Sequence, residues 1–253
     1  MACEVEVLFT PAEVRSWAAG DLSGTTCVMF DVLRATSTIV TALAAGAEGV
    51  LPVSEISEAL EWRRRRPDAL LAGERGGLRI GAALTGGREF DLGNSPREFT
   101  PARVAGRFIV TTTTNGTRAL RACAGAAEVL VGSFLNLSAT ARHLGNRPKG
   151  ILCLVCAGTG EAASLEDALA AGALCERLAS KVPATELRDS AALARGAFLQ
   201  ARHNLADAVG QTRHARHLLS LPELHEDVGF CLRLDAFDLV AVSDANEGVR
   251  RLV

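Results

Sequence analysis

Asp31 and Arg34 follow the apolar run 26–30 and precede a stretch that begins with Thr36 and Ser37. A carboxylate at the end of a strand can hold Mg²⁺ or attack a phosphorus atom, while an arginine and a helix start bind the anion. The alternative is that Asp31 only caps the following helix. Because Asp, Arg, Thr and Ser together exceed what a helix cap needs, we favour a functional site here.

A run of threonines and an Asn-Gly pair form the clearest candidate for an anion site. They lie between the apolar run 108–112 and a helical stretch, so hydroxyls and free N–H groups of the first turn would face one point. Glycine lets a ligand approach the backbone closely, and arginine adds a planar pair of donors. The alternative is a threonine-rich strand with an Asn-Gly hairpin turn, but a hairpin has no role between a strand and a helix. The residues concerned are Thr113, Thr114, Asn115, Gly116, Thr117 and Arg118.

Two neighbouring carboxylates, Glu166 and Asp167, begin another helical stretch. Ser164 and Asp167 have the spacing of a capping box, which explains Asp167 without any ligand. Glu166 is left over, and paired carboxylates of this kind hold Mg²⁺ together with several waters. The structural and the metal-binding roles stay equally open. Further polar clusters follow other strand candidates or lie in the segment 73–103: Glu74 and Arg75, then Asp91, Asn94 and Ser95, then Ser133 and Asn136.

Histidines and cysteines give weaker signals. His214 and His217 have a spacing that metal ligands use, but their arginine neighbours favour a surface helix. Cys153 and Cys156 lie in an apolar run typical of a buried strand, which points residues three apart to opposite faces. We therefore expect this C-x-x-C pair to pack in the core rather than to perform metal or redox chemistry, and we expect no disulfides.

Short apolar β-type runs alternate with Ala-rich helical runs, an alternation typical of α/β folds. We expect a layered α/β/α structure with a largely parallel or mixed sheet, and two interlocked lobes are an option. Segment 73–103 is glycine-rich and too polar for a core strand, so we interpret it as a long binding loop or lid within a single unit of residues 1–253. Strands are predicted at 5–9, 26–30, 50–53, 69–72, 108–112, 129–131, 151–156 and 239–242, and helices at 37–45, 54–65, 117–124, 136–144, 165–180 and 187–204.

The composition excludes several classes of protein. The 253 residues carry 27 basic and 29 acidic side chains, a formal net charge of −2. This near-neutral balance argues against nucleic acid and anionic membrane surfaces as partners. No apolar run reaches the roughly 20 residues of a membrane-spanning helix, and Glu4 and Glu6 stand where a signal peptide needs positive charge. We expect a cytoplasmic protein with a small anionic substrate, and a homo-oligomer stays open.

Six ordered stretches of the chain resemble the 2-phosphosulfolactate phosphatase family. The resemblance implies an α/β fold particular to that family and a Mg²⁺-dependent phosphatase that converts 2-phosphosulfolactate to sulfolactate, a step towards coenzyme M. It runs over most of the chain, although the part after about Asp189 matches loosely apart from Asp227. The stretches are 30–38 (FDVLRATST), 73–75 (GER), 90–96 (FDLGNSP), 112–118 (TTTNGTR), 132–136 (GSFLN) and 156–159 (CAGT), with Leu165, Glu166 and Asp167 after them.

Ligands of open α/β sheets bind beyond the carboxyl ends of the strands. On that rule we expect one cleft to collect Asp31, Glu74, Asp91, Asn94, Asn115, Arg118 and Glu166. We expect Asp31 to hold Mg²⁺ with Glu166 or Asp167, and a covalent nucleophilic role for Asp31 stays open. Arg34 and Arg118 would flank the phosphate, and Arg75 would meet a second anion of the substrate. The predicted phosphate contacts are Thr36, Ser37, Ser95, Thr113, Thr114, Gly116, Thr117 and Asn136.

Two other functions are compatible with these residues. One is a phosphatase for another small polyanionic phosphoester, such as the aspartyl-nucleophile class, although Leu33 stands where that class has its second aspartate. The other is a non-catalytic anion-binding regulatory module. Such a module would keep the arginines and the threonine run but would need no carboxylate cluster, so Mg²⁺-dependent turnover of a phosphoester separates the two.

Overall fold

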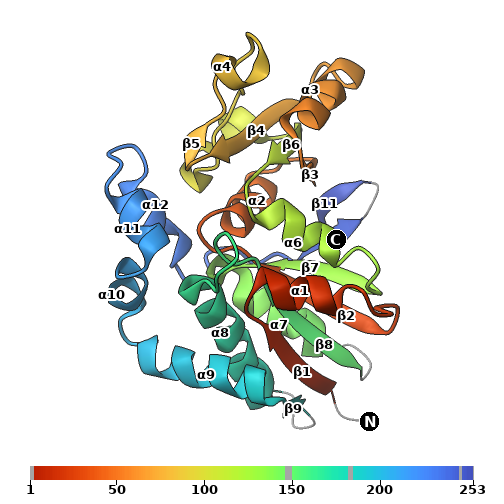
Figure 1. The fold of residues 1–253 in the computed structure, drawn as a ribbon, viewed down its shortest axis with the longest axis vertical. Coiled ribbons are helices and arrows are strands. Elements are labelled where there is room, and N and C mark those ends of the chain that lie inside the picture. Colours follow the sequence, from red (N-terminus) through yellow and green to blue (C-terminus); the bar gives the residue numbers. More distant parts are fainter. Residues whose placement is uncertain (1–2, 146–149, 182–184, 245–246, 253) are drawn as a thin grey trace.

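The computed structural model describes residues 3–145, 150–181, 185–244 and 247–252. They form an α/β fold in which helices cover both faces of one large mixed sheet (Figure 1). Along the sheet the described strands follow the order β5-β4-β6-β3-β11-β10-β7-β2-β8-β1-β9. The layered α/β/α architecture expected from the sequence is confirmed.

The first half of the sheet is parallel and contains the strands near the amino terminus. Neighbouring strands in it are joined by parallel ladders, such as the one that pairs Cys27 with Cys153. The strands are β9 (Thr185–Leu187), β1 (Cys3–Leu8), β8 (Ile151–Cys156), β2 (Thr25–Phe30) and β7 (Glu128–Gly132).

The second half is also parallel, apart from its edge strand. It contains β3 (Gly49–Pro52), β6 (Phe108–Thr112) and β4 (Leu70–Arg75), and β5 (Leu78–Arg79) turns back along β4. An antiparallel pair, β10 (Ala241–Asp244) and β11 (Gly248–Arg251), lies between the two halves. Because the steps from β7 to β10, to β11 and to β3 are all antiparallel, the two parallel halves run in opposite directions.

The helices form layers on the sheet and a separate group near the carboxyl terminus. One core cluster packs α7 and α8 against the first half, and another packs α1, α2 and α6 against its other face. The described helices are α1 (Pro11–Trp17), α2 (Ala35–Ala44), α3 (Ile56–Arg65), α4 (Ala82–Thr85), α5 (Pro101–Val104), α6 (Gly116–Ala122), α7 (Leu137–Gly145), α8 (Leu165–Lys181), α9 (Asp189–Ala201), α10 (Leu205–Gly210), α11 (Arg213–Leu219) and α12 (His225–Cys231), with 3-10 turns η1 (Pro96–Glu98) and η2 (Phe134–Asn136).

Helix α2 lies between the two halves of the sheet (Figure 1). All of its residues from Ala35 to Leu43 are buried, as expected for a helix that is apolar or weakly polar on every side. It follows β2 directly, so its first turn stands at the carboxyl end of that strand. The seam between the halves is therefore also where the residues after β2 are placed.

Most predicted elements are confirmed within a few residues, and the exceptions are short. Strands β5, β9 and β11 and helices α1, α4, α5, α10, α11 and α12 were not predicted as separate elements. Segment 73–103 contains the end of β4, the elements β5, α4 and η1, and most of α5. Cys153 and Cys156 lie on opposite faces of β8, in different core clusters, as their spacing predicted, and the described cysteines are all free. None of the described helices has the length and apolar character needed to cross a membrane.

Candidate active site

Both halves of the sheet contribute to one cavity of about 240 Å³. Its walls come from the residues after β2, β4, β6 and β8 and from helix α11. Although the halves run in opposite directions, residues near the carboxyl ends of strands from both of them line this cavity. The polar side chains on its walls are Asp31, Arg34, Glu74, Asn94, Thr113, Thr114, Asn115, Thr159, His214 and His217.

Asp31 is a buried carboxylate at the centre of this arrangement. Its backbone is held by Thr36, whose hydroxyl donates to the Asp31 carbonyl at 2.9 Å and accepts from the Asp31 N–H at 3.2 Å. Burial raises the pKa of Asp31 to about 7. Glu74 and Glu166 add negative potential in the same direction, while the Ala35 N–H and Arg34 oppose it. A bound cation would stabilise the ionised form of a carboxylate in this setting.

The threonine run is placed directly against Asp31 by Gly116, the first residue of α6. A Cβ atom at this position would lie 2.7 Å from Asp31 Oδ2 and 2.8 Å from Ala35 Cβ. None of the described residues accepts a hydrogen bond from the peptide N–H groups of Asn115, Gly116 or Thr117. Three free donors therefore stand beside a buried carboxylate at the start of a helix, where an anion is favoured.

We expect Gly116→Ala to lower kcat/KM for a phosphoester about a hundredfold, because the added methyl group must push α6 away from Asp31 and misplacement of about 1 Å has that cost. Gly196→Ala in α9 is the matched control. Nothing lies within 4 Å of the Cβ added there, so it should leave activity unchanged and stabilise the protein slightly. Steady-state kinetics on both purified variants measure this, and equal activity of the two would contradict the close contact.

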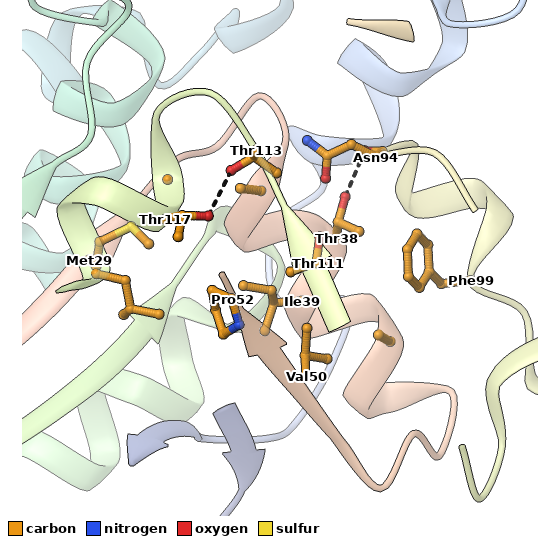
Figure 2. A pocket seen from close by; sticks show the side chains of 14 residues that line it. Met29, Thr38, Ile39, Val50, Pro52, Asn94, Phe99, Thr111, Thr113 and Thr117 are labelled. Carbon is orange, nitrogen blue, oxygen red and sulfur yellow. Dashed lines mark hydrogen bonds between the residues drawn. The ribbon is translucent and has the colours of Figure 1, made fainter. Parts of the chain in front are cut away.

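A small cavity of about 10 Å³ lies behind the threonine run (Figure 2). Its size is near the minimum for one water molecule. Figure 2 shows apolar side chains such as Met29 and Ile39 around it and the hydroxyls of Thr113 and Thr117 facing each other; these hydroxyls are 3.4 Å apart. Thr117 is buried here, so its contacts are with Thr113 and the core rather than with the larger cavity.

Glu74 fixes the threonine run to the turn after β4. Its Oε1 accepts from the N–H and the hydroxyl of Thr114, both at 2.9 Å, and its Oε2 accepts from the Gly77 N–H at 2.8 Å. Burial works to raise the pKa of Glu74, but these hydrogen bonds outweigh it and lower the pKa below its usual range. Glu74 is therefore an ionised carboxylate that positions this wall of the cavity.

Glu166 and Asp167 have different environments although they are adjacent. Asp167 accepts hydrogen bonds from the Val32 N–H at 2.8 Å and from the Gly158 N–H at 3.2 Å, so it braces two loops of the cavity. Burial and the charges of Asp31 and Glu166 raise its pKa well above the usual range. Glu166 is 2% exposed, yet none of the described residues donates a hydrogen bond to its carboxylate.

Arg34 is buried and is engaged by other parts of the protein. Its Nη1 donates to Asp227 Oδ2 at 2.8 Å, and its Nη2 donates to the Gly77 carbonyl at 2.6 Å. Asp227 is fully buried and also accepts from the Ser95 hydroxyl at 2.7 Å. This network connects α12 and η1 to the cavity wall. The Ser95 hydroxyl is bonded to Asp227 and is therefore not available to a ligand.

Several residues expected at the site are placed elsewhere or are occupied by structural contacts. Asp91 accepts from Arg63 at 2.7 Å and from the Leu71 N–H at 2.8 Å, away from the cavity walls. Asn136 is buried, and its side chain caps its own turn and donates to the Val131 carbonyl. The hydroxyls of Thr36 and Ser37 donate to the carbonyls of the preceding turn. These polar groups satisfy buried backbone instead of facing a ligand.

Two of the expected arginines also lie outside the cavity walls. Arg75 donates to the Glu74 carbonyl at 2.7 Å and to Thr112 Oγ1 at 3.1 Å. Arg118 is exposed and lines an adjoining groove with Arg15 and Glu161. Asn115 belongs to both the groove and the cavity, and it accepts from the Gly160 N–H at 3.3 Å. Arg118 is therefore next to the cavity mouth rather than inside it.

His214 and His217 form part of the cavity wall, which the sequence did not lead us to expect. The prediction of a surface helix is correct for Arg213, Arg216 and His217, which are exposed, but His214 is half-buried and both histidines also line the cavity. Burial lowers the pKa of His214, and Glu166 opposes that shift. The spacing of three residues, which places both rings on one helix face, was the only signal available.

The chain matches the family described as 2-phosphosulpholactate phosphatase over residues 9–246. A probable 2-phosphosulfolactate phosphatase of Caldanaerobacter subterraneus subsp. tengcongensis is 43% identical over 224 residues, which cover 87% of this chain and 88% of that protein. One from Symbiobacterium thermophilum is 41% identical over 226 residues, covering 88% and 93%. One from Thermotoga petrophila is 42% identical over 215 residues, covering 85% and 87%. With this coverage and identity, the chain belongs to the 2-phosphosulpholactate phosphatase family.

Proposed function

We propose that this protein is a Mg²⁺-dependent phosphatase that hydrolyses 2-phosphosulfolactate to sulfolactate and phosphate. Asp31 carries the proposal, because it is a buried carboxylate that lies against the threonine run and shares its surroundings with Glu74 and Glu166. A purely anion-binding module would need no such cluster of acidic groups beside its anion donors. The names of the relatives point to the same substrate.

The acidic groups fit a divalent cation that keeps some of its own water. Glu166 is a buried carboxylate without a hydrogen-bond donor among the described residues, and Asp31 lies within its electrostatic reach. Asp167 is already occupied by two N–H groups, so Glu166 is the better partner for Asp31. No three His, Cys, Asp or Glu side chains in the described part of the chain form a ready-made metal cage. Mg²⁺ is commonly held in this way, by one or two carboxylates, waters and a substrate phosphate.

The other groups of the site would bind and orient the phosphate. The free N–H groups of Asn115 and Gly116 would donate to its oxygens, and the Asn94 side-chain amide, which has no partner among the described residues, lies on the same cavity. Bound Mg²⁺ would supply a Lewis acid for the phosphoryl oxygen and a more acidic water. Water would attack phosphorus and lose a proton, the bond between phosphorus and the ester oxygen would break, and the ester oxygen would take up a proton, which gives sulfolactate and phosphate. This chemistry would place the enzyme in coenzyme M formation in the cytoplasm.

Chelation tests the metal. We expect EDTA to abolish phosphate release from 2-phosphosulfolactate and Mg²⁺ to restore it, because hard oxygen ligands without an adequate His or Cys set favour Mg²⁺ over Zn²⁺. Mg²⁺ at a hundredfold excess over its Kd should also stabilise the folded protein by about 2.7 kcal/mol, which raises Tm by about 5–10 °C in a chain of this size. Differential scanning fluorimetry measures the second effect without any turnover.

Glu166→Gln is the matched variant for this experiment, since it keeps the size of the side chain and removes its charge. It should lose most of the Mg²⁺-dependent rise in Tm, whereas Glu161→Gln, on the exposed loop beyond the cavity, should keep it. Full activity after exhaustive chelation would reject the metal. An equal Mg²⁺ response of the two variants would reject Glu166 as a ligand.

A further inference from the structure

Helix α11 closes one wall of the cavity with two imidazoles. His214 and His217 are three residues apart and so lie on one face of the helix. His217 is at the rim, with Nε2 3.2 Å from the Gly76 carbonyl oxygen. The turn of Gly76 and Gly77 has positive φ angles of 62° and 85°, and a Cβ atom at Gly77 would lie 3.4 Å from His217 Nε2. The double glycine lets α11 approach the cavity closely.

The arginines of the neighbourhood have few donors to offer a substrate within the cavity. Arg34 directs its two terminal nitrogens at Asp227 and the Gly77 carbonyl. Arg75 is turned to Thr112, and Arg118 lies in the adjoining groove. On the α11 wall, the His214 ring has no hydrogen-bond partner among the described residues, and His217 keeps one ring nitrogen beyond its contact with the Gly76 carbonyl, so these two rings can serve as donors to an anion in the cavity.

Asp31 and Glu74 line the cavity, and Glu166 adds negative potential at both Asp31 and His214. An anionic group in the cavity therefore needs a cation or hydrogen-bond donors beside it. A substrate with two anionic groups needs donors for the second group as well as for the phosphate. The rings of His214 and His217, on the α11 wall, supply donors of this kind.

We propose that His214 and His217 bind the second anionic group, a sulfonate or carboxylate, of the phosphoester substrate, so that α11 selects phosphoesters that carry such a group. This inference rests on the proposed phosphatase function. It also assigns to α11 the role that we expected for Arg75.

The test compares three substrates that share a secondary alkyl phosphate: 2-phosphosulfolactate, 2-phospholactate without the sulfonate, and isopropyl phosphate without either anion. For His214→Gln and His217→Gln, the ratio of kcat/KM on 2-phosphosulfolactate to that on isopropyl phosphate should fall at least tenfold, mainly through KM. A loss confined to 2-phosphosulfolactate identifies the sulfonate as the group bound, and an equal loss on 2-phospholactate identifies the carboxylate. His217→Arg, which keeps a cationic donor at the rim, should restore most of the ratio.

His203→Gln, on the exposed turn after α9, is the matched control and should leave the ratio at the wild-type value. Equal losses on all three substrates, relieved with an aryl phosphate whose leaving group needs no proton, would make His214 a general acid and overturn the proposal. Losses relieved by excess Mg²⁺ would make it a metal ligand and also overturn it. If the wild-type protein hydrolyses none of the three esters, the phosphatase function itself fails, which is a different result.

Discussion

Asp31→Asn should lower kcat for 2-phosphosulfolactate about a thousandfold and leave the protein folded. The variant keeps the size of the side chain but removes the charge that, in the proposed mechanism, would hold a cation beside the phosphate. Lewis-acid stabilisation of a phosphoryl transition state is worth several kcal/mol, and about 4 kcal/mol corresponds to a factor of a thousand. Phosphate release under saturating substrate measures it, with Asp21→Asn in an exposed loop as the control.

The same variant should be more stable than the wild type in the absence of metal, by an amount that depends on pH. The folded-state pKa of Asp31 is raised to about 7, against about 4 in the unfolded chain. Stability contributed by the protonated group is therefore present below about pH 4 and lost as the pH rises through 7. The advantage of Asp31→Asn should grow between these values and level off above pH 7. Urea unfolding at pH 4, 6 and 8 with EDTA measures this, and an advantage independent of pH would contradict the raised pKa.

Asp227→Ala should destabilise the folded protein by about 3–5 kcal/mol, because it leaves the Arg34 guanidinium buried without its counter-ion. The Arg34 and Asp227 side chains are 2% and 0% exposed, and their contact is 2.8 Å. The substitution also removes the acceptor of the Ser95 hydroxyl. Chemical unfolding measures the loss, and Tm should fall by about 10 °C.

Glu226→Ala is a close control, since Glu226 adjoins Asp227 but makes an ion pair with Arg97 at the surface. Exposed pairs contribute less than about 1 kcal/mol. A double variant, Arg34→Met with Asp227→Leu, should recover much of the stability lost in Asp227→Ala, because apolar side chains replace a buried pair without leaving a lone charge. Equal stability of Asp227→Ala and Glu226→Ala would show that the buried pair does not hold α12 to the cavity wall.

The positions of most strands and helices along the chain could be predicted from its residues. Apolar runs of five or six residues followed by Ala-rich stretches identify β1, β2, β6 and β8 and the helices after several of them, because these signals lie within one element. Polar residues at or near the carboxyl ends of strands, such as Asp31, Glu74 and Asn115, do line one cavity. Their position at strand ends is a local property, and the packing of strands into a sheet brings such ends together.

The partners of these residues could not be predicted from the sequence. Arg34 and Asp227 are separated by 193 positions, and Asp91 and Asn136 have the same polar character whether they face a ligand or satisfy buried backbone. Buried N–H groups and carbonyls that lack a backbone partner appear only when the chain is folded. The tertiary structure therefore decides which polar side chains form hydrogen bonds with these groups. The same holds for His214 and His217, since a short helix with mixed faces does not show which face is covered.

The direction of the strands depends on the tertiary structure most of all. A single parallel sheet would place every strand end at one edge, which is the reason we expected one cleft. In the structure the β10–β11 pair, from the end of the chain, reverses the direction between the halves, and residues near the strand ends of both halves still line one cavity. Side chains of a strand alternate between the two faces of the sheet, and this alternation is the same whichever way the strand runs. Residue types therefore identify the strands and the polar groups at their ends. Only long-range strand pairing decides how the strand ends of the two halves of the sheet are placed relative to each other.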